Sequence, residues 1–283
     1  MVLASSFSLA DQSDTNDEFD HFRLLKQKLI HDKFDPGLVE TLYSDDNIVF
    51  DVEGTGLFFM HNEATLHYQD FASKLSIALA KRYIRKHKSA LKKIEKKFGV
   101  DKTILTAIIL VETGLGTYTG KRPVINTLSS MAALSDPAVK EELWQSLEEE
   151  KSMPRKAFDK KANQKSAWAY KELKAFICYV NREHLDPLTL NGSYAGAMGI
   201  GQFMPTSILA FARDGDHDGS IDMFDHIDAL ASIANYLKRH GWHSGISKKK
   251  EKKVLLTYNN SSYYVGILMK ISSELKGKQR KHG

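Results

Sequence analysis

The sequence predicts a mainly α-helical protein built around one buried helix. That helix is expected within residues 101–120, because its centre is apolar on nearly every side: Ile104, Leu105, Ala107, Ile108, Ile109, Leu110 and Val111. Asp101 is suited to cap its start, and Gly114 and Gly116 stand where it would end. Helical spacing dominates much of the remaining chain. Glycine is modest at 18 and proline rare at 6 among 283 residues, so no long low-complexity linker is expected.

One carboxylate, Glu112, lies at the end of this apolar run. It has no cation nearby in the sequence, and the negative pole of the helix is close to it. Burial and this pole both disfavour the ionised form, so we expect the pKa of Glu112 to be raised. A carboxylic acid that stays protonated at neutral pH is suited to general-acid chemistry on a glycosidic oxygen. The alternative is a glutamate that leaves the core at the helix end and meets solvent.

The rest of the chain divides into four expected parts. Residues 1–20 are a disordered lead-in or the remnant of an export signal, because 8–10 have the small-x-small form of a cleavage site but no basic segment precedes them. Residues 21–98 form an N-terminal helical arm, with a short helix at 22–30, an irregular or partly extended connection at 45–63, and a basic helical run at 64–98. Residues 99–276 form the main core, and 277–283 a basic tail.

Within the core, helices are expected at 124–134, 136–150, 160–182, 206–213, 225–240, 252–260 and 262–275. Residues 191–202 break this rhythm with four glycines in twelve residues, which suits either a flexible turn or the wall of a ligand cleft. Tyr258, Asn259 and Tyr264 gather aromatic faces and an amide near the last two helices. Such a cluster suits a sugar ring and its hydroxyls, or equally a turn with packing tyrosines.

Residues 214–225 match a calcium-binding EF-hand loop. The expected oxygen ligands, at loop positions one, three, five, seven and twelve, are Asp214, Asp216, Asp218, Ser220 and Asp225. Gly219 at position six supports the match. Aspartate rather than glutamate at position twelve weakens bidentate binding, so Na⁺ or Mg²⁺ are alternatives to Ca²⁺. Asp225 can also cap the following helix.

Charge and cysteine usage limit the function classes. The net charge is +5, with lysines concentrated at 248–253 and 276–281, which suits an anionic partner such as nucleic acid, acidic lipid or cell wall, or a solvated loop and tail. No nucleic-acid recognition motif is present, and no run approaches the ~20 apolar residues of a membrane span. The single cysteine, Cys178, excludes an internal disulfide, and its apolar surroundings predict a buried thiol.

Several motifs together resemble one family. They are residues 97–101 before the buried helix, 111–113 at its end, Gly120 with 124–128, the run GSYAGAMGIGQFMP at 192–205, the loop 214–225, 234–242, and 258–259. In this order they resemble the lytic murein transglycosylase B family, the soluble-lytic-transglycosylase type with a goose-lysozyme-like core. The resemblance covers about residues 68–268. The β-rich segment that the family commonly carries between 242 and 258 is largely absent, so the cleft should be more open there.

The resemblance implies cleavage of peptidoglycan between N-acetylmuramic acid (MurNAc) and N-acetylglucosamine (GlcNAc) with formation of 1,6-anhydro ends. The single catalytic acid of the family falls on Glu112, and no catalytic cofactor is implied. Residues expected to line the sugar cleft are Ser193, Gln202, Tyr236, Tyr258, Asn259 and Tyr264. A hydrolytic muramidase and a non-catalytic, cation-dependent peptidoglycan-binding protein are the alternatives. A monomer in the periplasm or cell envelope, with glycan strands as its partner, is expected.

Overall fold

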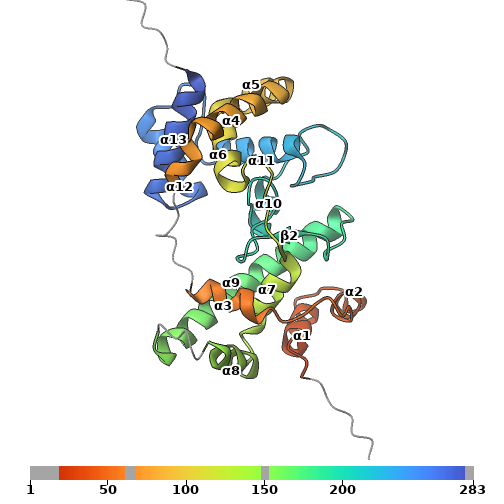
Figure 1. Cartoon of the computed structure of the whole chain (residues 1–283). Helices are drawn as coiled ribbons and strands as arrows, with labels where there is room; N and C mark the ends of the chain where they lie inside the picture. The colour runs from red at the N-terminus through yellow and green to blue at the C-terminus, as the bar shows by residue number, and fades with distance from the viewer. Residues whose placement is uncertain (1–18, 61–67, 148–152, 278–283) are drawn as a thin grey trace, which may run out of the picture.

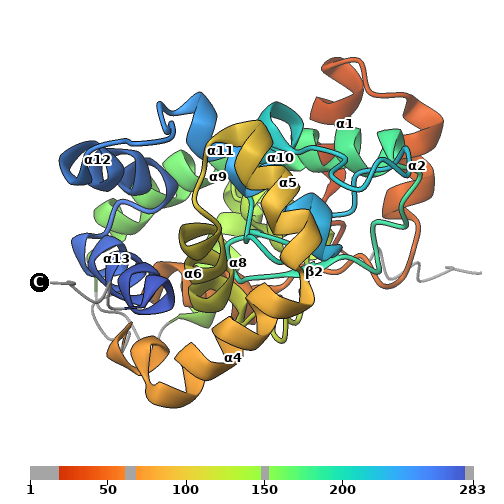
Figure 2. The same cartoon turned by 90° about the horizontal axis from the view of Figure 1, so that it is seen from above.

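The computed structural model describes residues 19–60, 68–147 and 153–277. As predicted, it is mainly helical (Figures 1 and 2). The elements in chain order are α1 (Arg23–His31), α2 (Pro36–Tyr43), α3 (Val52–Met60), the 3-10 helix η2 (Tyr68–Ala72), α4 (Lys74–Lys86), α5 (Lys88–Phe98), α6 (Lys102–Thr113), β1 (Arg122–Pro123), α7 (Val124–Ala133), α8 (Pro137–Ser146), α9 (Arg155–Arg182), β2 (Asn191–Gly192), α10 (Pro205–Phe211), α11 (His226–Arg239), α12 (Lys248–Tyr258) and α13 (Ser262–Lys276).

Helix α6 is the predicted central helix, and ten of its twelve residues are buried. The Asp101 side chain caps its start by accepting the Thr103 N–H at 2.8 Å, and Gly114 ends it in the left-handed conformation at φ 56°. Helix α6 packs chiefly against α13 and α4. A buried hydrogen bond of 2.7 Å between the hydroxyls of Thr103 and Ser272 fixes α6 to α13. The helix is therefore held from several sides, as a rigid support requires.

The long helix α9 supports the other half of the molecule by packing against α7 and α10. Its buried Ser166 donates to the Ala132 carbonyl at 2.7 Å, which ties it to α7. Its buried Glu172 accepts the Thr206 N–H at 2.9 Å and the Thr206 hydroxyl at 2.8 Å. Because Thr206 lies in the first turn of α10, Glu172 caps that helix from a neighbouring element. The start of α10 is thus fixed directly after the glycine-rich segment.

Three sequence-based expectations need correction. Residues 52–60 of the expected irregular connection form helix α3, because Phe58 and Phe59 pack against Trp168 and Phe158 at ring distances of 5.8 and 5.1 Å, which overrides the weak helix propensity of the local glycines. The expected helical run at 64–98 is broken at His87, which separates α4 from α5. Cys178 is exposed rather than buried, since it lies on the solvent side of α9.

The other expected helices are present, with small shifts in their ends, whereas helix α2 in the arm was not predicted. Residues 248–251, expected to precede a helix, are its first turn in α12. Residues 243–257 contain only a turn and this helix, so no β-rich segment is present there. Residues 1–18 of the predicted lead-in (1–20) and 278–283 of the predicted tail (277–283) lie outside the described residues, as do parts of the runs predicted at 45–63, 64–98 and 136–150.

We predict that Leu105→Ala in α6 lowers the free energy of unfolding by about 2–5 kcal/mol, because Leu105 is fully buried and its truncation leaves a cavity. Urea denaturation measures this loss. Leu75→Ala, at a site that is 69% exposed, is the control and should change stability by less than about 0.5 kcal/mol. Equal losses in both variants would contradict the central role of α6.

Candidate active site

A cleft of roughly 1270 Å³ runs between the N-terminal arm and the core. The glycine-rich segment, β1, the end of α6 and the junction of α12 and α13 form the core side, while residues of α3, its preceding loop and η2 form the arm side. The lining residues include Glu112, Ser193, Gln202, Tyr258, Asn259 and Tyr264 from the core, and Val49, Phe50, Asp51, Val52, Glu53, Leu57 and Phe71 from the arm. The cleft therefore collects five of the six predicted sugar-cleft residues around Glu112.

Glu112 lies at the cleft in the last turn of α6. Desolvation raises the pKa of its carboxyl group to about 7, while a hydrogen bond from the Tyr264 hydroxyl opposes part of this rise. The Tyr264 O–H donates to Glu112 Oε1 at 2.5 Å. A group with a pKa of about 7 is present in both protonation states at neutral pH, so Glu112 can give a proton and take one back.

Tyr258 forms part of the cleft wall, and Tyr236 lies behind it. The Tyr258 hydroxyl donates to the Gly201 carbonyl at 2.5 Å, and desolvation raises the pKa of this hydroxyl well above its ordinary value. Tyr236 is buried, packs edge-on against Tyr258 at a ring distance of 5.1 Å, and stacks on His240 at 4.0 Å. Its hydroxyl donates to the Thr257 carbonyl. The structure thus places Tyr236 in support of the wall, not in the lining where the sequence predicted it.

The glycine-rich segment is a tightly hydrogen-bonded wall. Ser193 Oγ accepts the N–H groups of Ala195 and Ala197 at 3.3 and 3.1 Å. The Gln202 side-chain amide donates to the carbonyls of Thr119 and Gly199, both at 3.0 Å. A Cβ at Gly199, which has φ 73°, would lie 2.4 Å from the Met223 carbonyl oxygen, so only glycine fits there. The segment therefore presents its polar side chains from a fixed backbone.

Backbone and hydroxyl bonds connect this wall both to α6 and to the loop at 214–225. The Ile200 N–H donates to the Met223 carbonyl at 2.9 Å. The Thr113 hydroxyl donates to the Ile200 carbonyl at 2.9 Å and also to the Ile109 carbonyl at 3.3 Å. Thr113 is the residue after Glu112, so the wall and the acid share one hydrogen-bonded frame.

Several lining residues were not predicted as part of the site, among them Asp51, Glu53, Arg122 and Asn126. Arg122 donates to Asp51 at 2.7 Å and pairs with Glu53 at 3.1 Å. Asn126 donates its amide to the Asn47 carbonyl at 2.9 Å, while its buried Oδ1 has no hydrogen-bond partner among the described residues. The sequence could not predict that Asp51 and Glu53 belong to the site, because they pair with Arg122 from 71 and 69 residues away in the chain. Asn126 does lie in a motif of the resembled family.

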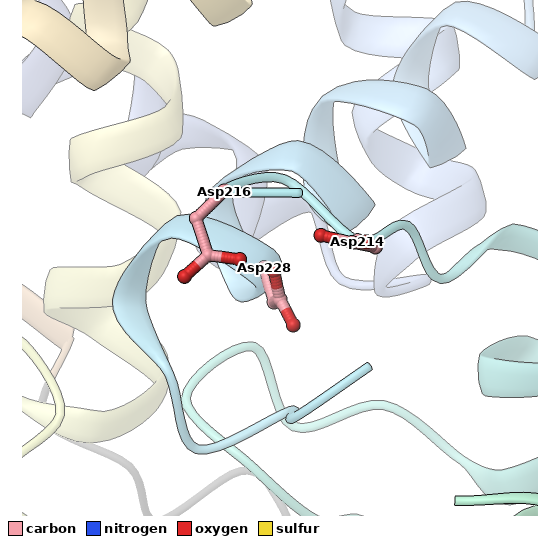
Figure 3. Close-up of side chains that lie close together, drawn as sticks. All are labelled: Asp214, Asp216 and Asp228. Atoms are coloured by element: carbon pink, nitrogen blue, oxygen red, sulfur yellow. The ribbon is translucent and has the colours of Figure 1, made fainter. Parts of the chain in front are cut away.

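The loop at 214–225 brings acidic groups together (Figure 3), but not the full predicted set. Carboxylate oxygens of Asp214, Asp216 and Asp228 all lie within 4.8 Å of one another. Buried Asp228 accepts the N–H groups of Gly215 at 2.7 Å and Asp222 at 2.8 Å, so it clamps both halves of the loop. Its burial raises its pKa, which those two hydrogen bonds oppose.

The other predicted ligands have different surroundings in this loop. Asp225 caps α11 by accepting the N–H groups of Ile227 and Asp228 at 2.6 and 3.1 Å, as its second predicted role requires. Asp218 accepts the Ser220 N–H at 2.8 Å. Asp228 was missed as a loop partner because it lies three residues beyond the motif, in the first turn of α11.

Comparison with known proteins shows which family the chain belongs to. Residues 58–251 match the transglycosylase SLT domain family. The chain belongs to this family. A stretch of 159 residues, 56% of the SLT chain, is 35% identical to membrane-bound lytic murein transglycosylase B of Escherichia coli (strain K12). That stretch spans only 37% of the length of this relative.

Solved structures show that the SLT chain shares its fold with known lytic transglycosylases. Soluble lytic transglycosylase SltB1 of Pseudomonas aeruginosa matches with a TM-score of 0.71 at 23% identity, over 89% of this chain and 97% of that one. The Escherichia coli lytic transglycosylase Slt35 in complex with calcium matches with a TM-score of 0.69 at 22% identity, over 90% and 92%. SltB3 of Pseudomonas aeruginosa in complex with NAG-anhNAM-pentapeptide matches with a TM-score of 0.71 at 19% identity, over 90% and 78%.

We predict that Glu112→Gln stabilises this SLT domain increasingly as the pH rises. In the unfolded chain the carboxyl ionises near its ordinary pKa of 4.5, but in the fold only near 7, so ionisation disfavours the folded state progressively between these values. Above pH 7 the full difference is roughly 3 kcal/mol. Glutamine is neutral in both states and avoids this loss.

Thermal melts of wild type and Glu112→Gln at pH 4, 6 and 8 test this linkage. The variant should gain stability relative to wild type between pH 4 and pH 8. Glu274→Gln, at an exposed position on α13, is the control and should show no such trend. A difference between Glu112→Gln and wild type that is independent of pH would contradict a desolvated carboxyl.

Proposed function

We propose that the protein is a lytic transglycosylase that cleaves the β-1,4 bond between MurNAc and GlcNAc in peptidoglycan. The observation that carries this proposal is the desolvated carboxyl of Glu112, with a pKa of about 7, in a cleft of roughly 1270 Å³. Membership of the SLT family supports it. The substrate is a glycan strand of the cell envelope, and the protein acts there as a monomer without a catalytic cofactor.

The reaction uses Glu112 twice. Protonated Glu112 donates its proton to the glycosidic oxygen as the bond from that oxygen to C1 of MurNAc breaks. The resulting carboxylate then accepts the proton of the MurNAc C6 hydroxyl as that oxygen bonds to C1. The products are a free GlcNAc hydroxyl and a 1,6-anhydro-MurNAc end, and no water is consumed. Tyr264, whose hydroxyl contacts Glu112, stabilises the carboxylate between the two proton transfers.

The surroundings of Glu112 favour this reaction over hydrolysis. Glycosidases that activate water, or form a glycosyl-enzyme, generally use a second carboxylate across the scissile bond. The other carboxylates in the described lining, Asp51 and Glu53, both pair with Arg122, and the Glu53 side chain is 82% exposed. A lone acid fits a substrate whose own hydroxyl is the nucleophile and whose acetamido group stabilises the cation.

The sugar-binding roles follow from positions in the lining. Ser193, Gln202 and Asn259 offer hydrogen bonds to hydroxyl and acetamido groups, while Tyr258 and Tyr264 flank the reacting ring. Tyr236 acts on substrate only through Tyr258. The short segment between residues 242 and 258 leaves that side of the cleft open to long strands.

We predict that wild-type protein converts insoluble murein into soluble muropeptides with 1,6-anhydro ends, and that Glu112→Gln reduces this rate at least about 10³-fold because the amide cannot transfer the proton. Mass spectrometry of the digest measures the products. Glu274→Gln is the matched control and should keep wild-type activity. Reducing ends alone would establish the hydrolytic muramidase instead. Murein binding by wild type without release of muropeptides would establish a non-catalytic peptidoglycan-binding protein.

We also propose that the loop at 214–225 binds a structural cation, Ca²⁺ first, with Na⁺ or Mg²⁺ as alternatives. The donors are hard carboxylate oxygens, with Asp214, Asp216 and Asp228 converging, and such a cluster suits a hard cation. Asp218, Ser220 and Asp225 supply further oxygens. The calcium complex of Slt35, a protein with the same fold, supports this choice of ion. The cation neutralises the loop and has no part in the chemical step.

We predict that Ca²⁺ raises the melting temperature, because it binds the folded state alone; at about 100 times its Kd the gain is about 2.7 kcal/mol. Asp216→Ala should remove this gain. Asp46→Ala, which removes an exposed carboxylate far from the loop in sequence, should retain it. Identical melting curves in Ca²⁺ and in chelator would exclude the site.

A further inference from the structure

Helices α4 and α5 form a basic hairpin, defined here as residues 74–98. It carries ten basic side chains and one acid, Glu95, and the ten are Lys74, Lys81, Arg82, Arg85, Lys86, Lys88, Lys92, Lys93, Lys96 and Lys97. Ten against one gives a net charge of +9, whereas the whole chain has +5, so the remaining residues together carry −4. The basic hairpin therefore carries more net positive charge than the whole chain.

The exposed face of α4 is amphipathic along its length. Leu75 and Leu79 are 69% and 45% exposed, and Arg82 and Lys86 are exposed as well. Steps of four, three and four residues place these side chains in one stripe of the helix. The opposite face is buried against the core through Ile77, Ala80 and Tyr83. Two leucines thus face solvent directly beside two cations, while the other face of the helix packs against the core.

The acidic loop at 214–225 offsets part of the charge of the basic hairpin, because Asp216 lines one pocket with Lys86, Lys93 and Lys97. Within the part of the chain that the structure describes, none of the ten cations forms an ion pair. The single acid of the hairpin, Glu95, pairs with Lys102 of α6 at 3.3 Å. Figure 2 shows α4 at the outer edge of the molecule, with α5 continuing from it. The surface is available to a large, flat anionic partner.

We propose that the basic hairpin docks on an anionic phospholipid membrane, with α4 lying in the plane of the interface. Lysine and arginine bind the acidic headgroups, at about 1 kcal/mol each near the surface, while Leu75 and Leu79 enter the boundary between headgroups and acyl chains. Leu75 and Leu79 favour a membrane over a soluble polyanion of the same charge. A soluble polyanion would engage the cations and leave both apolar side chains in water. This inference does not rest on the proposed function.

Flotation with vesicles of phosphatidylcholine alone and of phosphatidylcholine mixed with phosphatidylglycerol tests the proposal. Wild type should float only with the anionic vesicles. Arg82→Glu/Lys86→Glu should weaken this binding by about tenfold to a hundredfold. Lys249→Glu/Lys250→Glu, the same charge change on exposed positions of α12, is the matched control and should bind substantially better than the hairpin variant. Equal loss in both would reduce the effect to net charge and overturn the proposal.

The leucines are tested separately, because charge alone would also attract a polyanion. Leu75→Ser/Leu79→Ser should weaken vesicle binding about tenfold, whereas Leu38→Ser, at a position 36% exposed on α2, should not. In a Cys178→Ser background, Ala78→Cys labelled with an environment-sensitive dye should shift to the blue on anionic vesicles. Unchanged binding of the leucine variant, or no shift, would overturn the proposal.

A folding control and an activity control complete the test. All the substituted positions are exposed, so each variant should fold like the wild type. Circular dichroism checks this. All of these variants should digest soluble murein fragments at the wild-type rate, because none lines the cleft. The membrane proposal and the enzymatic proposal can therefore fail independently.

Discussion

The desolvation of one carboxyl group is the constraint on which the rest of this structure depends. Glu112 has an ordinary glutamate side chain, and only its surroundings raise its pKa to about 7. Those surroundings have to be rigid and low in polarity, because a flexible or wet site would restore the ordinary value. Helix α6 supplies the rigidity, since it is buried on nearly every side and bonded to α13 through Thr103 and Ser272. The same helix α13 brings the Tyr264 hydroxyl, which donates a hydrogen bond to the acid.

The glycine-rich segment, which forms one wall of the cleft, is held in place by a different kind of contact. Close approach of backbone to backbone fixes the glycine-rich segment, together with the burial of Met198, Ile200 and Phe203 in the core. A Cβ at Gly120 would overlap the Gly192 carbonyl group at 2.0 Å, and β1 pairs with β2 at this contact. Gly199 approaches the Met223 carbonyl in the same way. Polar side chains such as Ser193 and Gln202 then have little freedom, so the wall is formed before a ligand arrives.

The sequence was sufficient for the parts of the site that depend on local chemistry. The apolar run around Glu112, its missing cations and its position at a helix end predicted the central helix and the direction of its pKa shift. Contacts between residues far apart in the chain could not be predicted from the sequence. Helix α3 contains two glycines and becomes helical through aromatic packing against α9, and Arg122 meets Asp51 only after the chain has folded. Tyr236 and Tyr258 are both tyrosines near helix ends, and nothing local tells which of them faces the cleft and which lies behind it.

The loop at 214–225 is joined to the acid by a short covalent and hydrogen-bonded path. Asp228 holds the Asp222 N–H, the next residue Met223 accepts from Ile200, and the Ile200 carbonyl accepts from Thr113, whose neighbour is Glu112. Every link is either a peptide bond or a hydrogen bond of 2.8 or 2.9 Å. The loop thus acts as a mechanical anchor for the end of α6 that carries Glu112. An exchange of residues 222–224 for a segment of another length would loosen that anchor and shift Glu112, even though none of the exchanged residues lines the cleft.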